Sequence, residues 1–171
     1  IFGTQALGGI DRAASDAFVD RVMAHQAEHG FGFWAVERRA DRRVIGMAGV
    51  WWVPPEMAMP DQIEIGWRLH PDAWGRGFAT EAAQAALHYG FTVLERPEII
   101  AFTARANLAS QAVMCRIGMT PAPDRDFDHP RLAADHPLNQ ADSLTHEDLR
   151  QHRQIVIRDS GSRRIDSGWL G

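Results

Sequence analysis

The chain has 171 residues, a formal net charge of -4 at pH 7 and one cysteine, Cys115. A chain of this length most simply forms one domain. Its net negative charge gives no indication that it binds nucleic acid or an anionic membrane. A lone cysteine excludes an internal disulfide framework, and no apolar run reaches the roughly 20 residues of a membrane helix. We expect a cytoplasmic protein, monomer or homodimer, without nucleic-acid or membrane partners.

A helix and two strands are predicted in the first third of the chain. Residues 11–29 carry apolar side chains at helical spacing, whereas residues 33–37 and 44–53 predict antiparallel strands joined by a short turn. Trp51 and Trp52 lie on opposite faces of the second strand, because successive side chains alternate. We expect one of them in the core, while the other is a candidate for lining a pocket.

The central stretch combines a strand, a glycine-bearing turn and a long helix. Residues 63–69 alternate between apolar and polar or small side chains, as in a half-buried strand. Gly75 and Gly77 then allow a tight turn and leave backbone N–H groups uncovered. The apolar positions beyond it follow helical spacing: Ala79, Ala82, Ala83, Ala86, Leu87, Gly90, Phe91 and Leu94. A glycine turn that leads into a helix N-terminus favours an anion, so a phosphate-bearing ligand is predicted here.

Two common phosphate motifs do not fit this turn. A P-loop ends in Gly-Lys-Ser/Thr, whereas Gly77 is followed by Phe78 and Ala79. The dinucleotide fingerprint needs a third glycine where Thr80 stands, and the acid about 20 residues further on, Glu95, precedes the next strand instead of ending it.

A strand and a capped helix are predicted after the long helix. The strand covers residues 97–103, Asn107 is placed as the helix N-cap, and Gly118 as the helix stop. We expect Leu108, Val113 and Ile117 on the buried stripe of this helix, and Cys115 buried as well.

The last third of the chain has weaker patterns. Residues 119–127 predict a strand interrupted by prolines, residues 145–154 a short polar helix, residues 155–157 a closing strand and residues 159–171 a loosely ordered tail. Between them, residues 128–138 form a proline-punctuated connector. The late histidines are irregularly spaced, so no metal site is expected: His129, His136, His146 and His152.

The loop from Trp74 to Ala79 resembles the Gln/Arg-x-x-Gly-x-Gly/Ala loop of the GNAT acetyltransferases. The wider pattern, with the string from Glu64 through Glu81, Asn107-Leu-Ala-Ser110 and Gly118-Met119, is similar to the RimJ/RimL-type branch. The resemblance covers residues 31–137. It implies an α/β (α+β) GNAT fold, in which a mixed, mostly antiparallel central sheet is flanked by helices. We expect residues 1–158 to form this domain, with the first strand and helix of the family missing.

The resemblance implies acetyl-CoA as co-substrate and no metal. Backbone amides from Gly75 to Ala79 would hold the diphosphate, and the strand around Trp67 and Leu69 would pair with the pantetheine arm, which Asn107 would also contact. The cofactor-binding candidates are Trp67, Arg68, Leu69, Gly75, Arg76, Gly77, Phe78, Ala79, Thr80 and Asn107.

The implied reaction is transfer of an acetyl group to a primary amine by direct attack in a ternary complex. The acceptor is a protein N-terminal α-amine or a small-molecule amine. An amine attacks only when neutral, so a base is required. Glu64 is the candidate base, although a surface pair with Arg68 is an alternative. Met114 stands where many members have a tyrosine, so Ser110 is the nearest candidate for protonating the thiolate. A non-catalytic acyl-CoA-binding module is the alternative function.

Overall fold

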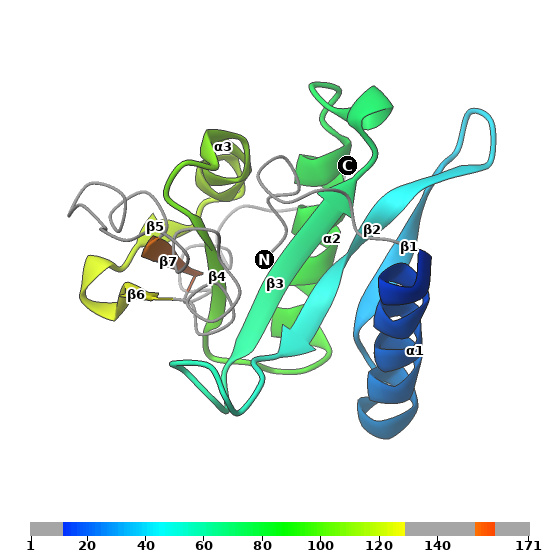
Figure 1. Ribbon diagram of the computed structural model, residues 1–171. Coiled ribbons are helices and arrows are strands. Elements are labelled where there is room, and N and C mark those ends of the chain that lie inside the picture. Colours follow the sequence, from blue (N-terminus) through cyan, green and yellow to red (C-terminus); the bar gives the residue numbers. More distant parts are fainter. Residues whose placement is uncertain (1–11, 129–152, 160–171) are drawn as a thin grey trace, which may run out of the picture.

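The computed structural model describes residues 12–128 and 153–159 (Figure 1). Within these ranges the helices and helical turns are α1 (Arg12–His29), η1 (Pro71–Ala73), α2 (Phe78–Thr92), α3 (Leu108–Arg116) and η2 (Pro123–Arg125). The strands are β1 (Phe33–Arg38), β2 (Arg43–Trp52), β3 (Ile63–Leu69), β4 (Ile99–Ala104), β5 (Thr120–Pro121), β6 (Phe127–Asp128) and β7 (Arg153–Asp159). The predicted elements of the first two thirds are confirmed to within a few residues.

The described strands form one mixed sheet in the order β1-β2-β3-β4-β7-β5, with β6 also paired to β7. Strands β1, β2 and β3 form antiparallel neighbours, and β7 pairs antiparallel with β4. The β3–β4 pair is parallel, because α2 crosses over between them. The predicted α+β architecture, a mixed and mostly antiparallel sheet with helices against it, is therefore confirmed.

The main hydrophobic core lies between the sheet and the helices α2 and α3, behind the sheet as drawn in Figure 1. Its buried members include Val50, Ile63, Ile65, Ala83, Ala86, Leu87, Ile99, Val113, Met114 and Ile117. Gly90 lets α2 approach the sheet closely, because a Cβ there would lie 2.3 Å from Ile99 Cδ1. The predicted apolar stripe of the long helix is confirmed.

The opposite face of the sheet carries its own apolar cluster, formed by Val53, Met57, Ile100, Phe102 and Ala122. Helix α1 lies in front of this face beside β1 and β2 (Figure 1). Its His25 ring stacks on Trp51, with 3.8 Å between ring centroids and 17° between planes. Trp52, on the other face, packs against the main core. The two tryptophans thus point to opposite faces, as predicted.

Two expectations for α3 are wrong. Leu108 is 72% exposed, because it is the first residue of the helix and projects away from the sheet. Cys115 is also exposed, because the buried face of α3 runs through Val113, Met114 and Ile117.

The predicted strand over residues 119–127 is instead two short strands, β5 and β6, separated by the turn η2. Pro121 and Pro123 account for the interruption, since neither supplies a backbone N–H. The closing strand at residues 155–157 is confirmed and extends over β7. It takes in residues 153 and 154, which were expected in a helix. The rest of that helix, the connector from residue 129, the four late histidines and the tail from residue 160 lie outside the described residues.

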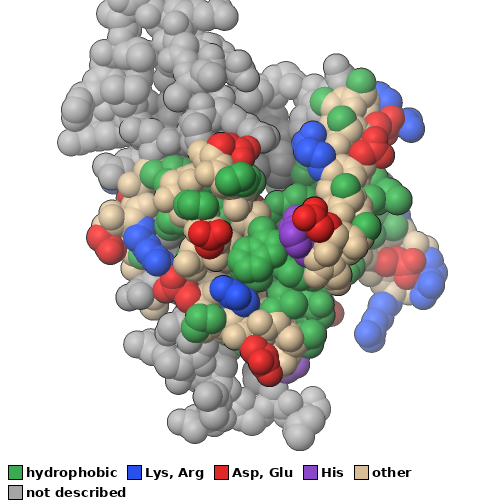
Figure 2. All heavy atoms as spheres, turned by 90° about the horizontal axis from the view of Figure 1, so that it is seen from below, with side chains coloured by type: hydrophobic (Ala, Val, Ile, Leu, Met, Phe, Trp, Pro, Cys, Tyr) green, Lys and Arg blue, Asp and Glu red, His purple; other side chains and the backbone are tan. Residues whose placement is uncertain are grey.

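The face seen from below has hydrophobic side chains at its centre, with basic and acidic side chains dispersed around them (Figure 2). The described residues of this face form no continuous basic surface. Within the described ranges, none of the helices combines the length and apolar character needed to cross a bilayer.

Candidate active site

Strands β3 and β4 separate directly after one paired position. Their parallel register holds a single pair, Glu64 with Ile100. Beyond it, residues 65–69 of β3 have β2 on one side and no strand partner on the other among the described residues. The backbone groups that face away from β2 are therefore available for an extended ligand, which can bind as an added strand.

The alternating direction of the backbone N–H and C=O groups along β3 shows which of them face away from β2. The N–H of His70 donates to Ile45 O of β2 at 2.8 Å. Along an antiparallel strand every second residue bonds to the same neighbour, so the residues two, four and six positions before His70 also bond to β2. Trp67 and Leu69 consequently direct their N–H and C=O groups toward the gap. The Leu69 carbonyl already accepts the indole N–H of Trp74, at 2.8 Å. Both groups of Trp67 and the N–H of Leu69 have no such internal partner among the described residues.

The turn before α2 has the backbone that its glycines require. Gly75 and Gly77 have φ of 69° and 84°, in the left-handed region, although a Cβ at either would meet nothing within 4 Å. Glycine is therefore required at these positions for the backbone conformation and not for close packing. The first helical hydrogen bond of α2 runs from Glu81 N–H to Gly77 O, at 3.0 Å. The amides of residues 75–80 have no partner among the described residues, and they gather at the positive end of the helix dipole.

The remaining loop candidates surround these amides. Arg76 is exposed, with its guanidinium carbon 5.4 Å from the ring centroid of Phe78. Phe78, Ala79 and Thr80 form the half-buried first turn of α2. A guanidinium beside free amides adds positive charge at a site already suited to phosphate.

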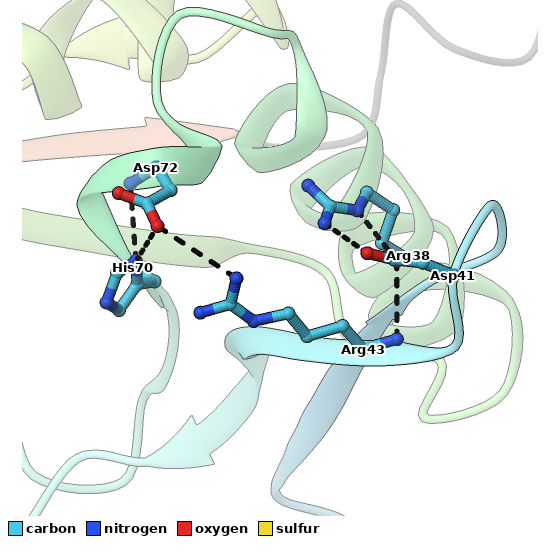
Figure 3. A network of polar contacts seen from close by, with 5 residues as sticks. All are labelled: Arg38, Asp41, Arg43, His70 and Asp72. Carbon is cyan, nitrogen blue, oxygen red and sulfur yellow. Dashed lines mark hydrogen bonds and ion pairs between the residues drawn. The ribbon is translucent and has the colours of Figure 1, made fainter.

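A polar network fixes the turn that leads into this loop (Figure 3). Asp72 N–H donates to His70 Nδ1 at 3.3 Å, and the Asp72 carboxylate lies 3.9 Å from Arg43 of β2. In the adjacent β1–β2 turn, a hydrogen bond from Arg38 lowers the pKa of Asp41 to about 2. Apart from Arg38 these groups are about half-exposed or more, so the network orients the turn more than it stabilises the fold.

Glu64 lies at the point where β3 and β4 separate, and it is 4% exposed. Its side chain is on the sheet face opposite α2, whereas its neighbours Ile63 and Ile65 enter the main core. Burial raises the pKa of Glu64 to about 8, because desolvation disfavours the carboxylate. The alternative of a surface ion pair with Arg68 is wrong, since Glu64 is not at the surface. Arg68 itself is half-buried on the same face.

Asn107 caps α3 and connects it to the end of β4. Its Oδ1 accepts the N–H of Ser110 at 3.1 Å, as an N-cap should. Its Nδ2 donates to Ser110 Oγ and to Thr103 Oγ1, both at 3.1 Å. Thr103 is 3% exposed and was not among the sequence candidates. A threonine at the end of an apolar strand, four residues before an N-cap, was the signal that could have identified it.

The position where many members of the resembled family have a tyrosine contains a buried apolar group. Met114 is 3% exposed and belongs to the main core, so it neither donates a proton nor faces the gap. Ser110 is half-buried and accepts the Asn107 amide, which leaves its own O–H free to donate elsewhere. Among the described residues, no three His, Cys, Asp or Glu side chains lie together as metal ligands do.

A strand that separates from its neighbour, free amides at a helix start and a buried carboxylate at the junction form the arrangement that the resemblance to the GNAT acetyltransferases implies. A sequence profile described as "Acetyltransferase (GNAT) domain" matches residues 5–120. That is more than half of the chain, and the protein belongs to the GNAT acetyltransferase family.

Known proteins agree with this assignment. The FsC-acetyl coenzyme A-N(2)-transacetylase of Aspergillus fumigatus is 35% identical over 99 residues, which is 53% of this chain and 40% of that protein. The chain spans between 33% and 63% of the lengths of the four curated relatives compared.

Solved structures share the fold at lower identity. An acetyltransferase from Agrobacterium tumefaciens has a TM-score of 0.64 at 23% identity, covering 90% of this chain and 75% of its own. A ribosomal-protein-S5-alanine acetyltransferase from Vibrio fischeri has a TM-score of 0.61 at 12% identity, covering 91% and 78%. At these identities the likeness shows the fold alone, so the RimJ/RimL-type branch stays a prediction.

Proposed function

We propose that this protein transfers the acetyl group of acetyl-CoA to a primary amine by direct attack in a ternary complex. The observation that carries the proposal is the position of Glu64. This buried carboxyl lies where β3 and β4 separate, next to backbone groups suited to an extended thioester ligand. The name of the Aspergillus fumigatus relative favours acetyl transfer from acetyl-CoA to nitrogen.

The cofactor end of the proposed site is the loop before α2. The free amides of residues 75–80 bind the diphosphate, and the Arg76 guanidinium adds charge. The pantetheine arm follows β3 and exchanges hydrogen bonds with the N–H and C=O of Trp67 and the N–H of Leu69. The Leu69 carbonyl already accepts the Trp74 indole N–H, which leaves one of its two lone pairs for the ligand.

The proton chemistry is proposed to begin at Glu64. Its carboxylate accepts a proton from the entering ammonium group and thereby frees the nitrogen lone pair for attack on the thioester carbon. A carboxyl pKa of about 8 is close to that of an α-amine, near 7.8, so this transfer is nearly balanced. The nearby ammonium charge favours the carboxylate form when the acceptor is bound.

The leaving group is proposed to depart on the other side of the sheet. As the carbon–sulfur bond breaks, the thiolate receives one proton, and Ser110 Oγ–H is the nearest candidate donor. Asn107 orients that hydroxyl through its Nδ2–H bond to Ser110 Oγ. The attacking nitrogen releases the second proton, which restores the Ser110 hydroxyl through solvent, while Glu64 releases the first proton to solvent. Amide, free thiol and one proton therefore balance the ammonium and thioester consumed.

The finer assignments also belong to this proposal. A protein N-terminal α-amine of the kind the RimJ/RimL-type branch modifies, or a small-molecule amine, is the acceptor class. Residues 1–158 are proposed as the acetyltransferase domain, and the pairing of β7 with β4 supports including residues 153–158. A cytoplasmic location and a monomeric or homodimeric state stay predictions.

Acetyl-CoA calorimetry combined with an assay of thiol release tests the proposal. Cys115 is exposed and reacts with thiol reagents itself, so a Cys115→Ser background removes that signal. We expect binding and turnover with simple amines, and Glu64→Gln to lower kcat by about 10² to 10⁴ with acetyl-CoA affinity retained. The matched control is Glu37→Gln, an exposed glutamate of β1 paired with Arg42.

The same measurements separate the two functions. Tight acetyl-CoA binding without turnover on any amine or N-terminal peptide would establish the acyl-CoA-binding module instead. The burial of Met114, which stands where many family members have a tyrosine donor, is the observation that favours that second function. Absence of acetyl-CoA binding would refute both.

A further inference from the structure

Thr103 places a hydroxyl near the end of an otherwise apolar strand. The preceding residues of β4 are Ile99, Ile100, Ala101 and Phe102, and all four are buried. Thr103 is 3% exposed, and among the described residues it is the one buried side chain that carries a hydroxyl. Alternation along β4 places it with Ile99 and Ala101 on the face that packs against α2 and α3. A hydroxyl removed from water destabilises the fold unless it forms a hydrogen bond, so its partner explains why a polar group is tolerated here.

The partner is the carboxamide of Asn107. Its Nδ2 donates to Thr103 Oγ1 and to Ser110 Oγ, both at 3.1 Å, and its Oδ1 accepts the Ser110 N–H at the same distance. The two N–H hydrogens of the amide group are therefore both used. Exchanging the oxygen and nitrogen would place the NH2 group against the Ser110 N–H, donor against donor. The carboxamide consequently has one favoured orientation.

Of the side-chain bonds of Asn107, the one to Thr103 joins the helix start to the sheet. The bonds between Asn107 and Ser110 connect two residues of the same cap, which can move together. The backbone bond from Asn107 N–H to Ala104 O, at 2.8 Å, fixes the chain at this point but leaves the carboxamide free to rotate. The direction of the carboxamide relative to β4 therefore depends on Thr103.

That direction affects what the Ser110 hydroxyl can do. A hydroxyl has one hydrogen and two lone pairs, and the Asn107 Nδ2–H occupies one lone pair of Ser110 Oγ. A hydroxyl that accepts a hydrogen bond is a stronger donor, because hydrogen bonds in series polarise one another. The same N–H stabilises the negative charge that develops on Oγ when the hydroxyl gives up its proton.

We propose that Thr103 is a positioning residue: its hydroxyl fixes the carboxamide of Asn107, which in turn prepares the Ser110 hydroxyl to protonate the leaving thiolate. The inference rests on the proposed acetyl transfer and adds a residue that acts only through others. The O–H bond of Ser110 breaks, an S–H bond forms, and Oγ recovers a proton that the attacking nitrogen releases to solvent. Because β4 also pairs with β3 at Glu64, one strand positions the candidate donor relative to the candidate base.

Thr103→Val tests this role, because valine keeps the shape of the side chain and removes the hydrogen-bond acceptor. In the Cys115→Ser background, with an amine that the wild type acetylates, we expect kcat to fall about tenfold. The KM for the amine and the acetyl-CoA dissociation constant should change by less than about twofold. Thr103→Ser, which keeps the hydroxyl, should retain at least half of the wild-type kcat. A loss that appears in KM or in acetyl-CoA affinity instead of kcat would overturn the inference.

A double-mutant cycle separates positioning from general damage to the fold. Ser110→Ala should lower kcat at least as much as Thr103→Val. Because Thr103 acts through Ser110, adding Thr103→Val to Ser110→Ala should lower kcat further by less than about twofold. Equal losses in both backgrounds would mean that Thr103 has only a structural role. Should the valine variant not fold, Thr103→Ala takes its place in the cycle.

The matched control is Thr92→Val, which removes a threonine hydroxyl that donates to His88 O at 2.7 Å at the exposed end of α2. It should leave kcat unchanged. A wild type that releases thiol but is indifferent to Thr103→Val or to Ser110→Ala would refute the positioning role and leave acetyl transfer intact. A wild type that releases no thiol with any amine would refute both.

Discussion

Replacing Glu64 by glutamine separates the cost of burying this carboxyl from its proposed use as a base. Glutamine has nearly the same shape, so the packing around residue 64 is retained while the titrating group is lost. Because Glu64 is 4% exposed and has a pKa of about 8, its effect on stability must depend on pH.

The size of that dependence follows from two pKa values, 4.5 in the unfolded chain and about 8 in the folded protein. At pH values between these two pKa values, Glu64 has lost its proton in the unfolded chain but keeps it in the folded protein. The stability of the wild type therefore falls as pH rises. The decrease amounts to about 2.5 kcal/mol between pH 5 and 7 and about 1.4 kcal/mol more by pH 9. Below pH 4.5 this contribution vanishes. Glu64→Gln should therefore gain stability relative to the wild type over this range while it loses activity.

Urea unfolding of both proteins at pH 5, 7 and 9 measures the difference, with Glu37→Gln as the exposed control. The control should differ from the wild type by less than about 1 kcal/mol, because the ion pair between Glu37 and Arg42 lies near the surface. A pH-independent difference for Glu64→Gln would refute the reasoning, since it would mean that the carboxyl ionises normally in the folded protein. Activity should rise with pH toward 8, as Glu64 loses its proton.

Substitutions at three further positions test the loop, the helix packing and the cap. Gly77→Ala, at φ 84°, should cost about 1 to 2 kcal/mol and weaken acetyl-CoA binding in calorimetry; unchanged affinity would argue against a ligand at the loop. Gly90→Ala should lower thermal stability by about 1 to 3 kcal/mol, since its Cβ meets Ile99, and an unchanged melting temperature would contradict this close contact. Asn107→Ala should cost about 1 to 2 kcal/mol by removing the cap. Asn107→Asp should restore the cap but not the donor to Thr103, and equal stability of both variants would contradict the capping role.

Local patterns predicted the elements that position the site. The alternation along β3 and the helical spacing of α2 are properties of neighbouring residues, so sequence alone identified both. Gly75 and Gly77 were likewise identified, because a positive φ in a tight turn depends on the residue at that position and not on distant contacts. Asn107 was recognised as a cap from its place before a helix.

Contacts between distant segments were not predictable in the same way. Alternation placed Glu64 on the polar face of a half-buried strand, and its burial depends on neighbours across the sheet, such as Trp51 and Ile100. The exposure of Cys115 depends on which side of α3 meets the sheet, which a short helix with few apolar residues hardly specifies. The strands β5 and β6 are two residues each and exist through pairing with β7, from about 30 residues later in the chain.

One strand links the two ends of the proposed site, and its neighbours indicate how the link is kept rigid. The Trp74 indole N–H bonds to the last carbonyl of β3, so the glycine loop is tied to the strand that carries Glu64 five residues earlier. On the other side, seven paired positions join β3 to β2, and β2 holds Trp51 against His25. On the β4 side a single pair, at Glu64, joins the strands, so the rest of that edge of β3 has no strand partner among the described residues. This asymmetry favours a preformed site in which the cofactor enters between fixed elements, because β3 is braced at both its end and its β2 edge.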